Sequence, residues 1–94
     1  MPDTGSVTFF DDALIVSWVF NATKAQLTVS AAYNTKPVGS PVVLTPQQPT
    51  GQISGQSDGH NVTIDLSANF STQQLTIAAN QTNPARQSTQ STSF

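Results

Sequence analysis

The best candidates for a binding site in this sequence lie in two short polar segments. The first holds Tyr33 and Asn34, and the second holds Asp58, His60 and Asn61. An aromatic ring beside carboxylate, amide and imidazole groups suits a sugar, because the ring covers the apolar C–H face while the polar groups bond the hydroxyls. We therefore predict a carbohydrate site made of these five residues.

In this interpretation the Tyr33 ring stacks on the sugar, Asp58 accepts hydroxyl hydrogens, and the remaining three residues fix the ligand's orientation. Two of the five also have a structural interpretation. Tyr33 continues the phase of the apolar residues Leu27 and Val29, which is typical of a core stripe. Asp58 belongs to an Asp-Gly pair, which favours a tight hairpin turn.

Trp18 is in phase with Leu14, Val16 and Phe20, so the pattern indicates a core position. If Trp18 were exposed, it would be the strongest stacking candidate in the chain.

Catalysis is not indicated, because the chain has no cysteine, no glutamate and one histidine. Asp58 and His60 share one turn, where the carboxylate cannot reach Nδ1 from behind the ring as a catalytic triad requires. Asp11 and Asp12 are adjacent, which is typical of a turn and unsuited to a carboxylate dyad. We predict a protein that is not an enzyme and needs no cofactor or metal.

The composition narrows the possible partners. Charged residues make up 9% of the 94 residues, and the three cations, Lys24, Lys36 and Arg86, are scattered. Nucleic acid needs a cationic surface, so it is excluded as a partner. No apolar stretch approaches the roughly 20 residues of a membrane helix, and the N-terminus lacks the pattern of a secretory signal. We expect no membrane insertion and a cytoplasmic location.

Period-two alternation recurs along the chain without helical periodicity, which predicts an all-β fold. The expected strands cover residues 6–10, 13–20, 26–33, 42–45, 51–54, 60–67 and 73–79. Six to seven short strands between turn signals indicate a small antiparallel β-sandwich or flattened barrel. Residues 1–83 form this single domain, and no internal repeat is evident. Residues 84–94 are a polar C-terminal tail, expected to be mobile unless a partner orders it, with Phe94 as a possible anchor.

The strand expected at residues 13–20 is apolar on both faces, since Ile15 and Val19 alternate with Leu14, Val16 and Trp18. A strand in a sandwich normally has one solvated face, so something should cover the second one. A symmetric homodimer that pairs Ile15 and Val19 across a two-fold axis is one explanation. An enclosing strand from the same chain, residues 6–10, is the other.

The chain begins Met-Pro, lacks cysteine, carries few charges, is rich in Asn, Gln, Ser and Thr, and contains the stretches ALIVSWVF and SDGHNVTIDLS. In this overall character it resembles the small cytosolic mushroom lectins. The resemblance implies a β-rich dimer that binds terminal α-linked galactose and agglutinates through its two protomers. The competing hypothesis is a structural or adhesion β-domain that self-assembles without binding sugar.

Overall fold

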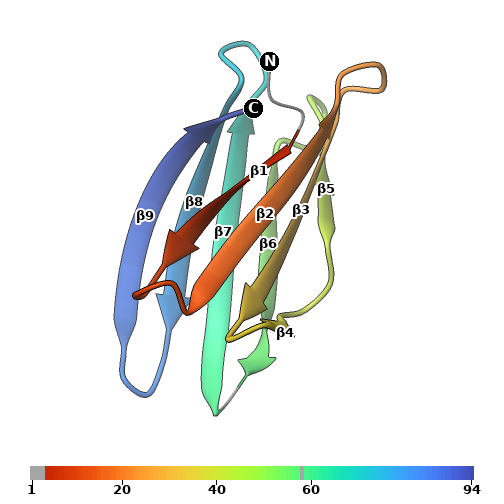
Figure 1. Cartoon of the computed structure of the whole chain (residues 1–94). Helices are drawn as coiled ribbons and strands as arrows, with labels where there is room; N and C mark the ends of the chain where they lie inside the picture. Colours follow the sequence, from red (N-terminus) through yellow and green to blue (C-terminus); the bar gives the residue numbers. More distant parts are fainter. Residues whose placement is uncertain (1–3, 58) are drawn as a thin grey trace.

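The fold consists of two antiparallel β-sheets packed face to face (Figure 1). In the computed structural model, which describes residues 4–57 and 59–94, strands make up 68% of the structure and no helix occurs. The strands are β1 (Thr4–Phe9), β2 (Leu14–Asn21), β3 (Gln26–Tyr33), β4 (Lys36–Pro37), β5 (Val42–Leu44), β6 (Thr50–Ser57), β7 (His60–Asn69), β8 (Gln74–Gln81) and β9 (Arg86–Ser93). The prediction of an all-β antiparallel sandwich is confirmed.

The first half of the chain forms sheet A and the second half forms sheet B. Sheet A has the order β1-β2-β3-β4, with β5 also paired to β3, and sheet B has the order β6-β7-β8-β9. Ser57 pairs with His60 across the β6–β7 turn, so the predicted hairpin is present. The edge strands meet at the sides of the sandwich, where β1 lies beside β9 and β5 beside β6.

The core lies between the sheets and is built by the alternating positions of each strand. Leu14, Val16 and Trp18 of β2 are buried, so the prediction of Trp18 as a core residue is confirmed. In β7 the side chains of Val62, Ile64 and Leu66 are buried in the same way. In β8 the side chains of Leu75 and Ile77 are fully buried.

The two halves repeat the same structure, although the sequence analysis found no repeat. The β2–β3 pairs Leu14↔Tyr33 and Asn21↔Gln26 recur 48 positions later as the β7–β8 pairs Val62↔Gln81 and Asn69↔Gln74. Five identities fall in this span, with Asn21, Gln26, Leu27, Thr28 and Ala31 recurring as Asn69, Gln74, Leu75, Thr76 and Ala79. The repeat is hidden because inward positions need only apolar bulk, and because the turns between the first two strands of each half differ in length.

The shared asparagines explain the matching turns. Asn21 Oδ1 accepts a hydrogen bond from Lys24 N at 3.2 Å, and Asn69 Oδ1 accepts from Ser71 N at 3.0 Å and Thr72 N at 3.1 Å. Such Asx bonds stabilise a turn locally, and each turn also ends in a left-handed residue, Ala25 or Gln73. The same amide chemistry therefore closes the central hairpin of both sheets.

The C-terminal segment corrects the prediction of a mobile polar tail. Residues 86–93 form β9, paired with β8 along its whole length, and Phe94 is 1% exposed. Backbone hydrogen bonds to β8 need no apolar side chains, and Phe94 N also donates to Gln73 O at 3.0 Å. Phe94 packs near the rings of Trp18, Phe20 and Phe70, which confirms it as an anchor.

Among the residues that the structure describes, no element of the chain covers the outer face of sheet A. Strand β1 pairs beside β2 in the same sheet, so the hypothesis that residues 6–10 enclose the second face of β2 is wrong. Ile15, Val19 and Val43 remain 37%, 53% and 48% exposed on this face. Within residues 4–57 and 59–94 no helix is long and apolar enough to cross a membrane.

Candidate functional site

Loops of both sheets meet at the lower end of the sandwich in Figure 1, which we call the loop end. It comprises residues 10–13 between β1 and β2, residues 34–35 between β3 and β4, the start of β7, and residues 82–85 between β8 and β9. Asn34 N donates to Ala13 O at 2.7 Å, and Thr82 N donates to Asn61 O at 3.1 Å. The loops are therefore fixed to their neighbours by backbone hydrogen bonds.

The backbone of the loop end is unusual. Six of the eight described non-glycine residues with positive φ lie there, namely Phe10, Asp11, Asp12, Asn34, Thr35 and Asn83. The left-handed region is disfavoured for residues with a Cβ atom, and such residues gather at sites where geometry matters for binding. This concentration points to the loop end as the place where the fold holds side chains for a purpose other than packing.

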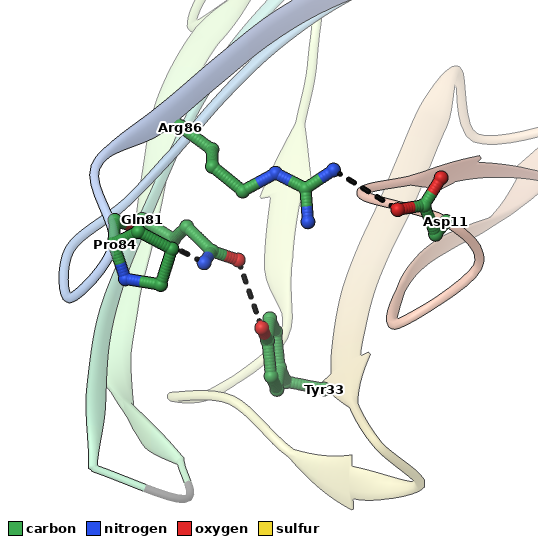
Figure 2. Close-up of polar contacts among 5 residues, drawn as sticks. All are labelled: Asp11, Tyr33, Gln81, Pro84 and Arg86. Carbon is green, nitrogen blue, oxygen red and sulfur yellow. Dashed lines mark hydrogen bonds and ion pairs between the residues drawn. The ribbon is translucent and has the colours of Figure 1, made fainter.

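A buried hydrogen bond joins the two sheets at the centre of the loop end (Figure 2). Tyr33 Oη donates to Gln81 Oε1 at 2.8 Å, and Gln81 Nε2 donates to Pro84 O at 3.2 Å. Tyr33 and Gln81 are each 4% exposed, and they occupy equivalent positions in the two halves of the chain. Ser57 Oγ also donates to the carbonyl of Tyr33 at 3.2 Å. These contacts form a fixed floor beneath the loops.

An arginine–aspartate pair lies on one side of this floor (Figure 2). Arg86 Nη2 is 3.3 Å from Asp11 Oδ2, and the guanidinium lies over the Phe10 ring at 5.2 Å from its centroid. The Asp11 and Arg86 side chains are 92% and 40% exposed. An exposed pair of this kind contributes only about 0–1 kcal/mol to stability, and it places donors and an acceptor side by side at the surface.

His60 packs against the Tyr33 ring of the floor. Its ring centroid lies 5.2 Å from that of Tyr33, and its Nδ1 lies 3.0 Å from Thr82 O. A carbonyl oxygen only accepts, so Nδ1 carries the proton of this hydrogen bond, and in the neutral ring Nε2 is left as an acceptor. His60 is partly exposed, so a ligand can reach it.

The structure brings together only part of the predicted site. Tyr33 is buried, so the prediction that its ring stacks on a sugar is wrong, and the alternative of a core position is confirmed. His60 contacts Tyr33, and Asn34 lies in the exposed turn at the same end. Asn61 follows His60 on a strand and therefore projects from the outer face of sheet B, away from Tyr33. Asp58 lies outside the described residues.

Two residues of the loop end were missed as site residues by the sequence analysis. Asp11 was interpreted as a turn residue and Arg86 as part of a tail, and no pattern connects residues 75 positions apart. Gln81 did carry a signal, because it continues the inward phase of Leu75, Ile77 and Ala79. A polar residue in a core phase predicts a buried hydrogen-bond partner.

The Tyr33–Gln81 hydrogen bond gives a stability prediction. Tyr33→Phe leaves Gln81 Oε1 buried without its donor, so we expect the free energy of unfolding to fall by about 1–3 kcal/mol in a urea titration. Tyr33→Phe combined with Gln81→Leu should cost less than the two single changes together, because it removes both polar partners. A Tyr33→Phe variant as stable as the wild type would contradict this assignment.

Within the described part of the chain, no three His, Cys, Asp or Glu side chains come together as a metal site would require. Comparisons with protein-family models, with curated proteins and with solved structures give no match for this chain. The functional argument therefore starts from the loop end itself.

Proposed function

We propose that this chain is a non-enzymatic carbohydrate-binding protein, a lectin, that binds neutral sugars at the loop end and acts as a homodimer. The observation that carries the proposal is the arrangement of Asp11, Arg86 and His60 around one rigid floor. A carboxylate accepts from sugar hydroxyls, a guanidinium donates to them, and an imidazole nitrogen can accept. Because His60 is already held by Thr82 O and by the Tyr33 ring, little of its ordering entropy is lost on binding.

The contacts of His60 favour binding over catalysis. Its described partners are the carbonyl of Thr82 and the Tyr33 ring, whereas a general base needs a nucleophile on one side and an orienting group on the other. By its resemblance to the small mushroom lectins, we propose terminal α-linked galactose as the preferred ligand.

The homodimer is supported by the difference between the two outer faces. Ile15, Val19 and Val43 on sheet A have Thr63, Ser67 and Ser91 at the equivalent positions of sheet B. Strands β1, β2, β3 and β5 place no charged residue on the outer face of sheet A. The same fold therefore has one outer face suited to water and one suited to a second copy, and a dimer adds avidity to weak sugar sites.

A glycan array tests the lectin proposal. We expect selective binding to α-galactosyl termini. A calcium chelator should leave this binding unchanged, since the proposed contacts are direct hydrogen bonds from protein side chains to the sugar. Retention on a different set of termini would correct the ligand and keep the lectin. A folded protein that binds nothing on the array would refute the proposal.

Loss of His60 should weaken binding without unfolding the protein. We expect His60→Ala to raise the Kd for the array ligand by roughly tenfold, which corresponds to about 1.4 kcal/mol, because a neutral hydrogen bond and a ring contact disappear. Its unfolding free energy should drop by no more than about 1 kcal/mol. Gln74→Ala, an exposed change at the other end of the sandwich, is the control. Unchanged affinity in His60→Ala would remove His60 from the site.

One observation favours the second candidate function, a structural domain that self-assembles. The edge strands β6 and β9 are eight residues long each and contain neither lysine nor proline, the residues that usually block pairing between sheet edges. Light scattering as a function of protein concentration separates the two functions. Growth beyond a dimer, unaffected by any sugar, would support the structural role and count against the lectin.

A further inference from the structure

A polar hollow lies at the end of the sandwich opposite the loop end. The β7–β8 turn and the C-terminus lie at this end, which is uppermost in Figure 1. We call this end the turn end. The hollow has a volume of about 340 Å³ and lies between the loop that joins the two halves of the chain and the β7–β8 turn. Its lining includes Pro46, Pro49, Ser67, Asn69, Phe70 and Ser71, and it contains no charged side chain. Volumes of this order are usual for small-molecule sites.

The aromatic wall of the hollow is rigid. The Phe70 ring packs edge-on against Phe94, with centroids 5.3 Å apart and planes at 71°, and lies 6.3 Å from the Phe20 ring. Phe94 is fully buried, so it holds Phe70 in place from below. Phe70 itself is only partly buried and lines the hollow. It thus supplies the fixed apolar surface that Tyr33 does not supply at the loop end.

Polar groups lie beside this ring. Asn69 Oδ1 accepts from two backbone amides of the turn, so the orientation of its amide is set. The Nδ2 group then faces away from those amides and remains a donor for a ligand. The hydroxyls of Ser67 and Ser71 are exposed and form no hydrogen bond within the described part of the chain.

The internal repeat shows which of these features the fold itself requires. The turn asparagine occurs in both halves, as Asn21 and Asn69, so it belongs to the architecture. In contrast, Phe70 has Ala22 at the equivalent position, and Ser67 has Val19. The aromatic ring of Phe70 and the hydroxyl of Ser67 are therefore additions to one half only, whereas Ser71 corresponds to Thr23, which also carries a hydroxyl.

From these observations we infer that the hollow is a second carbohydrate site, which takes a neutral hexopyranose with its C–H face on Phe70 and its hydroxyls on Asn69, Ser67 and Ser71. The inference rests on the proposed lectin function and extends it, because it makes each protomer divalent. The molecule is 39 Å along its longest axis, so two sites at opposite ends can bind separate glycans. One protomer could then bridge two surfaces.

An NMR titration of the full-length protein tests this inference. The probes are methyl glycosides of galactose, mannose, fucose and N-acetylglucosamine, each followed through backbone amide shifts. We expect at least one probe to shift the amides of Ser67, Asn69, Phe70 and Ser71. Shifts confined to the loop end would overturn the second site and leave the lectin proposal standing. No shift at either end would overturn both.

A matched pair of variants checks the assignment of the ligand contacts. Ser71→Ala should raise the Kd measured at the turn end by about fivefold, whereas Thr23→Ala, the equivalent position in the first half, should leave it unchanged. Both sites are exposed turn positions, so neither change should affect folding. Equal affinity in Ser71→Ala and Thr23→Ala would count against the second site, even if shifts were seen nearby.

Discussion

Replacing Phe94 with alanine is expected to lower the free energy of unfolding by about 3–5 kcal/mol, the usual loss when a buried phenylalanine is truncated. Phe94 is 1% exposed, and its ring makes edge contacts with the rings of Phe20 and Phe70. The centroid of its ring lies 6.3 Å from that of Trp18. The free energy of unfolding of a chain of this size is only about 5–15 kcal/mol in total. A single residue at the end of β9 therefore contributes a large share of this free energy.

Thermal and urea unfolding measure this effect. One kcal/mol shifts the Tm of a small domain by about 4–8 °C, so we expect Phe94→Ala to melt about 12–40 °C below the wild type. Ser93→Ala changes the exposed neighbour and should leave the Tm within a few degrees. If Phe94→Ala melted like Ser93→Ala, the segment from residue 86 onward would be a detached tail, as the sequence alone predicts, rather than a strand of sheet B.

Val19→Asp is expected to convert the proposed dimer into a monomer. Val19 is 53% exposed on the uncharged outer face of sheet A. An aspartate there would be buried without a partner in a symmetric interface, and would meet its own copy nearby, at a cost of several kcal/mol. We therefore expect the dimer dissociation constant to rise by about 10²-fold or more, measured by sedimentation or light scattering.

The internal repeat provides the matched control. Ser67→Asp places the same charge at the equivalent position of sheet B, where the face is already polar, and it should leave the dimer intact. Sugar affinity at the loop end should be the same in both variants, since neither position belongs to it. A Val19→Asp protein that remains dimeric would remove the outer face of sheet A as the interface.

The predicted strands agree with the observed ones where apolar and polar side chains alternate along the sequence. Residues 26–33 match β3 at both ends, and the Asp-Gly pair marks the β6–β7 hairpin, because a pattern of period two and a turn pair are local properties of the chain. The prediction of a mobile tail at residues 84–94 was wrong because this segment lacks such alternation. Strand β9 has no apolar residue to mark it, and its order comes from the backbone of β8 and from the burial of Phe94.

The structure brings together only part of the predicted site because a strand sends successive residues to opposite faces. His60 and Asn61 are adjacent in sequence, yet His60 packs on Tyr33 while Asn61 faces outward from sheet B. The ring of Tyr33 could be interpreted as a core residue or as a stacking surface, and burial between the sheets decided for the core.

The sequence by itself determined the all-β class, most strand positions, the core residues of β2, β7 and β8, and the low charge. These properties depend on composition and on neighbours one or two residues apart. Only the tertiary structure decided that Arg86 meets Asp11, that Tyr33 meets Gln81, and that the two halves repeat. Such contacts join residues tens of positions apart, and they exist only once two sheets have packed face to face, so no local pattern can encode them.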